Sequence, residues 1–227
     1  MRNNWPVIKA AFPHTIPVLT GYIFLGMAFG ILLQSTGYGV WWAFLMSLII
    51  FAGSMQIVTV GLVAAGFYPL QALLLTLIVN ARHVFYGLTM LTKFSSMGRL
   101  RPYMIFGLTD ETYSLLCTIE PPPGIDRPRF CFFVTLMNHS YWVLGSVLGG
   151  LAGAVLPFDY TGIEFVMTAL FVVIFLEQWR QQQDHRPALI GMGFSLLCLL
   201  IFGAEWFILP SMAAIVIALT AIRRSYT

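Results

Sequence analysis

The sequence predicts an all-α, polytopic integral membrane protein with about seven or eight hydrophobic segments, some of which can be discontinuous or re-entrant. Of the 227 residues, 59% are hydrophobic and only 9% are charged, whereas a soluble domain carries roughly 25% charged residues. Apolar runs of about 20 residues, the length that crosses a bilayer, recur along nearly the whole chain. We expect these runs to be helical because lipid forces backbone groups to pair within a segment, and the alternating pattern of a β-barrel is absent.

Breaks in hydropathy separate the candidate segments. They span residues 14–33, 40–65, 69–91, 102–119, 130–155, 161–179, 187–203 and 206–221. The connections are mostly short and leave no room for a sizeable aqueous domain, so residues 1–227 are expected to form a single integral membrane domain. The N-terminal stretch shows no cleavage site of a signal peptide, so the first apolar segment is expected to stay in the protein.

Basic residues gather beside segment ends and bear on orientation, because cytoplasmic loops are rich in Lys and Arg. Eight plain crossings place both termini and residues 127–129 on the cytoplasmic side, but they leave the basic loop 93–101 outside. A re-entrant segment at 102–119 would remove that conflict, yet it would by itself force the N-terminus outward. The topology stays open at this point. The formal charge of +3 needs no nucleic-acid partner, since no basic stripe with interleaved aromatic residues is present.

Polar residues interrupt the segment at 69–91. A helix that starts near Leu70 reaches Arg82 after about 18 Å, past the middle of a hydrocarbon core of about 30 Å, where an Arg costs on the order of 3 kcal/mol. On a helix, Asn80 and His83 face one side and Arg82 and Tyr86 another, so the segment must meet polar surroundings on two sides or lose helical form near Asn80. Alternatively, Arg82 snorkels to the interface or pairs with a carboxylate merely to hold helices together.

Two adjacent acids, Asp110 and Glu111, lie within the segment at 102–119. Neighbouring side chains point in different directions on a helix, so one acid can face a cavity while the other meets Arg82. Such acids can take up protons, because burial disfavours a charged carboxyl group and a nearby cation favours it. The alternative is an interfacial cap of a half-helix with no transport role.

The segments 40–65 and 130–155 hold further candidates. Gly53 and Ser54 would let a helix open and expose backbone groups, and Gln56 would hydrogen-bond a ligand, although small residues also permit tight helix packing. Asn138 and Trp142 share one side of their helix. Small residues recur at four-residue spacing and predict close backbone crossings, at Gly26, Gly30, Gly145, Gly149 and Gly153.

The sequence lacks the motifs of a catalytic or metal site. There is no HExxH, no GxSxG and no phosphate-binding run of glycines that ends in Lys, so we expect no enzyme, no cofactor and no metal. The three cysteines, Cys117, Cys131 and Cys198, have no metal-ligand spacing and are expected to be small core residues. Polar residues at membrane depth beside Gly breaks suit a carrier for a small, partly polar solute. A non-transporting membrane scaffold and an integral membrane enzyme remain the alternatives.

The motifs FAGSMQ, NARHVFYG, GLTDETYS and NHSYWVLG occur in the order and spacing of a known family. From about residue 10 to residue 155, the chain resembles the large subunit of branched-chain amino acid exporters, the AzlC-type or azaleucine-resistance permeases. The resemblance implies a multi-pass protein of the bacterial inner membrane that exports leucine, isoleucine and valine, in some members also methionine, driven by the proton-motive force. It also implies a separately encoded, small and very apolar partner subunit of the AzlD type.

The resemblance and the polar clusters together define the expected site. The expected substrate-binding residues are Gly53, Ser54, Gln56, Asn80, Arg82, His83, Tyr86, Asn138 and Trp142, and the expected proton-coupling residues are Asp110, Glu111 and His83. Arg82, or backbone N–H groups near Gly53, would receive the substrate carboxylate, and Asp110 or Glu111 would receive its ammonium group. The branched side chain would rest on Phe85, Tyr86 or Trp142. The chain departs from the usual family pattern at residues 54–57, where Ser-Met-Gln-Ile replaces Ala-Ser-Gln-Phe, which leaves the preferred side chain open.

Overall fold

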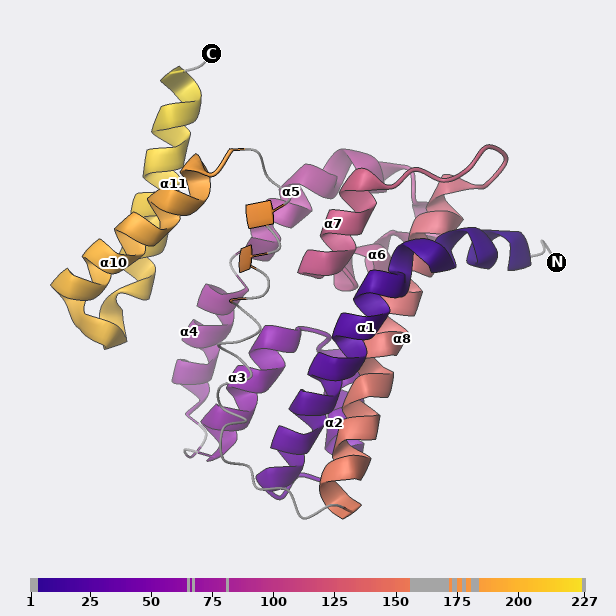
Figure 1. Ribbon diagram of the computed structural model, residues 1–227, viewed down its shortest axis with the longest axis horizontal. Coiled ribbons are helices and arrows are strands. Elements are labelled where there is room, and N and C mark those ends of the chain that lie inside the picture. The colour runs from indigo at the N-terminus through magenta and orange to yellow at the C-terminus, as the bar shows by residue number, and fades with distance from the viewer. Residues whose placement is uncertain are drawn as a thin grey trace. The chain divides into compact units, whose positions relative to one another are not determined.

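The computed structural model describes residues 4–64, 66, 68–80, 82–155, 172, 175–176, 179–180 and 184–225. Every regular element within these residues is a helix, which confirms the predicted all-α class (Figure 1). Residue contacts divide the chain into two compact units, residues 1–167 and 168–227. The predicted segment 161–179 lies largely outside the described residues. The expectation of a single domain stays a prediction.

Two long parallel helices form the centre of unit 1. They are α1 (Trp5–Ser35) and α8 (Arg127–Val155), and both are long and apolar enough to cross a membrane (Figure 1). The two helices run in the same direction, because residues nearer the end of α1 contact residues nearer the end of α8. Thr15 Oγ1 lies 3.0 Å from the Tyr141 hydroxyl, and further along Gly30 lies against Gly149.

Glycines let the backbones of α1 and α8 touch. A Cβ added at Gly26 would lie 2.9 Å from Ser146 N, and one added at Gly145 would lie 2.7 Å from Tyr22 O. Gly149 faces the backbone of Met27 at still closer range. The predicted close crossing is therefore confirmed, and no side chain larger than hydrogen fits at these positions.

Three predicted segments are each split into two helices. Residues 40–65 form α2 (Val40–Ile49) and α3 (Gly53–Ala64), and residues 69–91 form α4 (Pro69–Val79) and α5 (Arg82–Ser95). After a short 3₁₀ turn, η1 (Gly98–Leu100), residues 102–119 form α6 (Arg101–Phe106) and α7 (Asp110–Thr118). The polar segment therefore loses helical form next to Asn80, one of the two outcomes that the sequence allowed.

The break between α2 and α3 is centred on Phe51. Its φ of 44° lies in the left-handed region, which is unfavourable for a bulky side chain. Packing holds it there: the ring is buried, its centroid lies 4.3 Å from that of His139, and it also contacts Tyr22. Beside the break, a Cβ added at Gly53 would lie 2.9 Å from the Trp142 ring, so the first residue of α3 must be small.

A threonine ends the break between α6 and α7. Thr109 has an extended conformation, and its hydroxyl accepts a hydrogen bond of 3.3 Å from Thr112 N, as an N-cap residue does. Asp110 and Glu111 occupy the first turn, where carboxylates offset the positive end of the helix dipole. Local chemistry thus places both acids at the start of α7.

The pairs α2–α3 and α6–α7 each turn back on themselves. Val40, at the start of α2, lies against Gly150 near the end of α8, whereas Ser47 O reaches His139 in the middle of that helix at 3.2 Å. From the break, α3 returns toward the end where α2 began (Figure 1). In the second pair, α7 runs back toward the start of α8, because Leu116 packs in one core cluster with Phe130.

These two reversals bring the basic stretches of unit 1 to one end. Val7, Phe94, Met97, Leu116 and Phe130 share a core cluster, so the starts of α1 and α8 lie beside the end of α5. The Lys93 ammonium donates to Leu116 O at 3.2 Å at the same end. The conflict over loop 93–101 disappears because two segments turn back rather than one.

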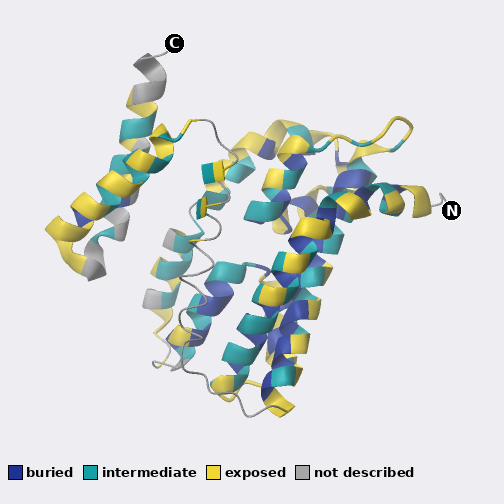
Figure 2. Ribbon diagram, in the orientation of Figure 1, coloured by how far each residue is buried: buried dark blue, intermediate teal, exposed yellow. Residues whose placement is uncertain are grey.

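Apolar side chains cover much of the outside of both units. Figure 2 shows buried residues on the facing sides of α1 and α8 and exposed residues along α10 (Arg186–Trp206). In unit 2, α10 packs on α11 (Ile208–Ser225), and Gly203 interrupts α10 with a φ of 72°. Leu200 is 85% exposed. Such a surface is suited to lipid or to an apolar partner chain and is unsuited to water.

Candidate functional site

A partly buried ion pair joins three helices of unit 1. Arg82 Nη2 lies 2.9 Å from Asp110 Oδ2 and donates a hydrogen bond of 2.7 Å to Ser54 Oγ. The Arg82 and Asp110 side chains are 31% and 17% exposed. Of the two neighbouring acids, Asp110 is therefore the one that meets Arg82.

The ion pair lies where three half-helices begin. Ser54 is in the first turn of α3, Arg82 is the first residue of α5, and Asp110 is the first residue of α7. The start of a helix carries about half a positive elementary charge and N–H groups without partners inside the helix. This arrangement favours a bound anion next to Arg82, and Asp110 balances part of the positive potential.

Glu111 belongs to a second polar network, which runs from α1 through α7 to α8. The Tyr22 hydroxyl donates to Glu111 Oε2 at 2.6 Å and shares a hydrogen bond of 2.7 Å with Thr109 Oγ1. Thr109 Oγ1 lies 3.1 Å from Thr112 Oγ1, which accepts a hydrogen bond of 3.1 Å from Asn138 Nδ2. A chain of hydroxyl groups therefore connects the Glu111 carboxyl group to Asn138.

A third network surrounds the break between α2 and α3. Trp142 Nε1 donates to Gln56 Oε1 at 2.9 Å, and Gln56 Nε2 donates to Ser47 Oγ at 3.2 Å. His139 Nε2 lies 3.2 Å from Ser47 O, and its Nδ1 lies 2.9 Å from the Tyr103 hydroxyl. Gln56 is fully buried, and both polar atoms of its amide group are hydrogen-bonded, so its contacts hold α3 to α8 and α2.

Some buried polar atoms of these networks have no hydrogen-bond partner in the described part of the chain. They are Arg82 Nε, Asp110 Oδ1, Asn138 Oδ1 and Asn80 Oδ1. Buried polar groups are nearly always paired in folded proteins, so each of these atoms marks a position for water or a ligand. Arg82 Nε is a donor, and the other three are acceptors.

His83 and Tyr86 lie beside the ion pair on α5. His83 Nδ1 lies 3.2 Å from Asn80 O, and its ring meets the Tyr86 ring edge-on at 5.6 Å. Tyr86 in turn stacks on Tyr113 of α7 at 4.4 Å and lies next to Asp110. These contacts of His83 are with Asn80 in the preceding turn and with Tyr86 of α5.

The structure brings together most of the residues that the sequence predicted. Direct contacts join Ser54, Arg82 and Asp110, and also join Gly53, Gln56 and Trp142. Phe85 does not line this region, because it is 51% exposed and faces outward.

Sequence reasoning missed several polar members of the networks. They are Tyr22, Ser47, Tyr103 and Thr112. Each lies within an apolar segment, so a hydroxyl group at membrane depth was the available signal. Within the described residues, no group of three His, Cys, Asp or Glu side chains is placed to hold a metal ion.

Comparisons with known proteins agree on one family. A family model described as AzlC protein matches residues 17–156. The branched-chain amino acid transport protein AzlC of Bacillus subtilis is 46% identical over 220 residues, which are 97% of this chain and 87% of that protein.

Two further species carry similar membrane proteins. A membrane protein of Haemophilus influenzae is 44% identical over 93% of this chain and 87% of its own length. The inner membrane protein YgaZ of Escherichia coli is 28% identical over 78% of this chain and 76% of its own length. No solved structure matches the chain.

Proposed function

The chain belongs to the AzlC family of membrane proteins, whose members include a named branched-chain amino acid transport protein, and from this premise we propose that it is the large subunit of a branched-chain amino acid exporter. Its substrates in this proposal are leucine, isoleucine and valine, with methionine as a further candidate, and proton flow drives their export. The observation that carries the proposal is the Arg82–Asp110 pair at the starts of α3, α5 and α7.

The polar atoms that lack partners in the described part of the chain complement an amino acid zwitterion. The substrate carboxylate would bind Arg82 Nε and the N–H groups at the start of α3, beside Gly53 and Ser54. The ammonium group would bind Asp110 Oδ1 and Asn138 Oδ1, which are acceptors without partners in the described part of the chain. Both charged ends of the substrate must be matched because an unpaired charge in a dry site is costly.

The side chain of the substrate needs an apolar surface close to these polar atoms. Tyr86 and the Trp142 ring are the aromatic groups next to the ion pair and to the start of α3. Gln56 would act indirectly, since its amide group already holds the Trp142 indole in place. Asn80 offers one further acceptor near the break.

Proton coupling is assigned to the acids of α7. Asp110 would exchange its bond to Arg82 for a bond to the substrate, and Glu111 would take up or release the proton through its bond to Tyr22. His83 is a further candidate because it lies on α5, one residue beyond Arg82. A mechanism of this kind links solute binding to protonation through one short helix.

The proposal also includes the membrane that holds the chain and a partner subunit. The name of the Escherichia coli relative places that protein in the inner membrane, and we propose the same membrane for this chain. The exposed apolar surfaces of both units leave room for a small, apolar AzlD-type subunit. The two subunits together would form the working exporter.

Counterflow of labelled leucine in proteoliposomes tests the proposal. We expect uptake against preloaded leucine, stronger with the AzlD-type subunit present, and net export when a pH gradient is imposed. Arg82→Gln should lower the initial rate at least about tenfold, because a lost charge pair with a bound carboxylate costs more than about 1.4 kcal/mol. Arg99→Gln, in the exposed η1 turn, is the matched control and should keep the rate.

Two results would contradict this function. Wild-type protein that shows no leucine counterflow with or without the small subunit would point to the scaffold or to the enzyme. Arg82→Gln protein that keeps the wild-type rate would remove the proposed site and leave the family membership untouched.

A further inference from the structure

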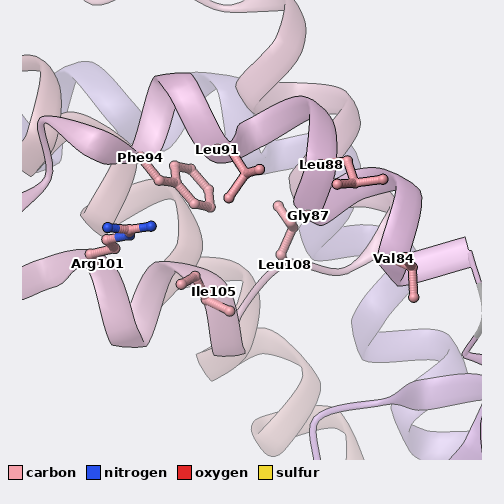
Figure 3. Close-up of a pocket in the computed structure, with 8 residues that line it drawn as sticks. All are labelled: Val84, Gly87, Leu88, Leu91, Phe94, Arg101, Ile105 and Leu108. Atoms are coloured by element: carbon pink, nitrogen blue, oxygen red, sulfur yellow. The ribbon is translucent and has the colours of Figure 1, made fainter.

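An open apolar pocket of about 250 Å³ lies along α5 and α6, and neither Arg82 nor Asp110 lines it (Figure 3). It is lined by Val84, Gly87, Leu88, Leu91, Phe94, Arg101, Ile105 and Leu108. Phe94 and Leu108 are buried and form its floor, whereas the side chains along its edges are mostly exposed. A Cβ added at Gly87 would meet no atom within 4 Å, so the groove stays open above this glycine.

The groove has the length of one lipid leaflet. The lining residues of α5 run from Val84 to Phe94, which corresponds to about 15 Å at the rise of an α-helix. This is about half of a hydrocarbon core of about 30 Å. Val84 is two residues beyond Arg82, which the sequence predicts past the middle of the hydrocarbon core, and Phe94 belongs to the basic stretch 93–101. A single acyl chain therefore fits the groove in one leaflet.

The only charged group among the lining residues is Arg101, which lies at the Phe94 end of the groove (Figure 3). Among the residues that the structure describes, no ion pair involves Arg101. The ion pairs found there are Arg82–Asp110, Arg127–Glu120, Arg129–Asp126 and Arg186–Asp184. The Arg101 guanidinium thus remains available to an anion from outside the chain.

We propose that this groove binds an anionic phospholipid, with an acyl chain over Gly87 and the phosphate group on Arg101. An apolar groove that ends in a cation with no ion-pair partner among the described residues matches a molecule with an apolar tail and an anionic head. Lys93 and Arg99 in the same loop add positive potential at the level of the head groups. The site is independent of the proposed transport site and does not rest on it.

Lipid that stays with the purified protein tests this site. The protein is reconstituted in nanodiscs of equal parts phosphatidylglycerol and phosphatidylcholine, gently extracted, and its bound lipid is measured by mass spectrometry. Wild-type protein should retain phosphatidylglycerol in preference to phosphatidylcholine, and Arg101→Gln should lower this preference about fivefold. Arg99→Gln should change it much less, because Arg99 does not line the groove.

A second variant separates the tail from the head group. Gly87→Leu places a side chain in the groove at a position where an added Cβ meets no atom within 4 Å, and it should reduce retention of both lipids while Arg101 stays in place. Inorganic phosphate added during extraction should not displace the lipid, since it lacks the tail. Equal retention by wild type and Arg101→Gln would overturn the proposal. So would complete loss of the bound lipid when a small partner subunit is added, because a protein helix would then be the occupant.

Discussion

The salt bridge between Arg82 and Asp110 can either hold helices together or bind substrate, and these two roles can be told apart by mutation. A pair that only holds helices together can be replaced by two neutral groups, since removing both charges avoids an unpaired charge in a poorly hydrated place. A pair that binds a zwitterion cannot be replaced in this way. The distinction is measurable because both side chains are polar without charge after Arg82→Gln and Asp110→Asn.

We therefore expect the double variant Arg82→Gln/Asp110→Asn to fold better than either single variant but to remain defective in transport. Each single variant should reduce the yield of monodisperse protein, because it leaves one charge unpaired, and the double variant should restore much of that yield. Leucine counterflow in vesicles should stay at least about tenfold below wild type in all three. Recovery of counterflow in the double variant would assign the pair a structural role only.

Glu111 is expected to separate substrate exchange from proton coupling. Glu111→Gln keeps a side-chain oxygen that can accept the hydrogen bond from the Tyr22 hydroxyl, but it can no longer exchange a proton. Exchange of labelled for unlabelled leucine should therefore continue within about threefold of wild type, because one neutral hydrogen bond contributes about 0.5–1.5 kcal/mol. Net export driven by a pH gradient should be lost. If gradient-driven export survives in Glu111→Gln, the coupling acid lies elsewhere.

Charged residues were easier to find from the sequence than their hydroxyl partners. Arg82 and Asp110 stand out because a charge at membrane depth is rare and costly. Tyr22 and Thr112 do not stand out, since Tyr and Thr also occur in ordinary apolar helices and a Thr hydroxyl can bond its own helix backbone. Their contacts depend on which helices lie side by side, which spacing along one chain does not reveal.

At the scale of helices, the close crossing of α1 and α8 makes a sharp stability prediction. Gly149→Ala places a methyl group against the backbone of Met27, so the two helices must separate. We expect the variant to be less stable by about 1–3 kcal/mol, the usual cost of overpacking. Gly21→Ala is the matched control on α1, because its new methyl group would meet no atom within 4 Å. The free energy of unfolding of both variants can be measured by titration with a denaturing detergent. Equal stability of the two variants would contradict the close crossing.

The positions of most apolar segments in unit 1 were predictable, although α1 begins at Trp5 and not near residue 14, whereas the breaks were predictable only in part. Asn80 and Arg82 signalled one break because their side chains need polar surroundings on two sides of a helix. Gly53 signalled another, but the residue that turns the chain there is Phe51, whose left-handed conformation no local rule favours. Long-range packing on His139 and Tyr22 holds it. Tertiary contacts, more than composition, therefore decided where α2 ended.

At the scale of the whole molecule, orientation follows from the two reversed helix pairs. In unit 1, α2–α3 starts and ends at one end and α6–α7 starts and ends at the other (Figure 1). Lys9, loop 93–101 and residues 127–129 consequently share one end, whereas eight plain crossings would have divided them. Since cytoplasmic loops are rich in Lys and Arg, this shared end is expected to face the cytoplasm.

The native cysteines allow a direct test of this orientation. Cys117 is exposed at the basic end, where Cys117 O lies 3.5 Å from Lys93 Nζ, while Cys131 and Cys198 are buried. A membrane-impermeant maleimide should therefore label Cys117 in inverted vesicles and leave it unlabelled in right-side-out vesicles. The variant Cys117→Ser/Ser35→Cys moves the exposed thiol to the opposite end and should give the reverse pattern. Labelling of Cys117 from the outside would place the basic end outward and refute the predicted orientation, because the end rich in Lys and Arg would then face away from the cytoplasm.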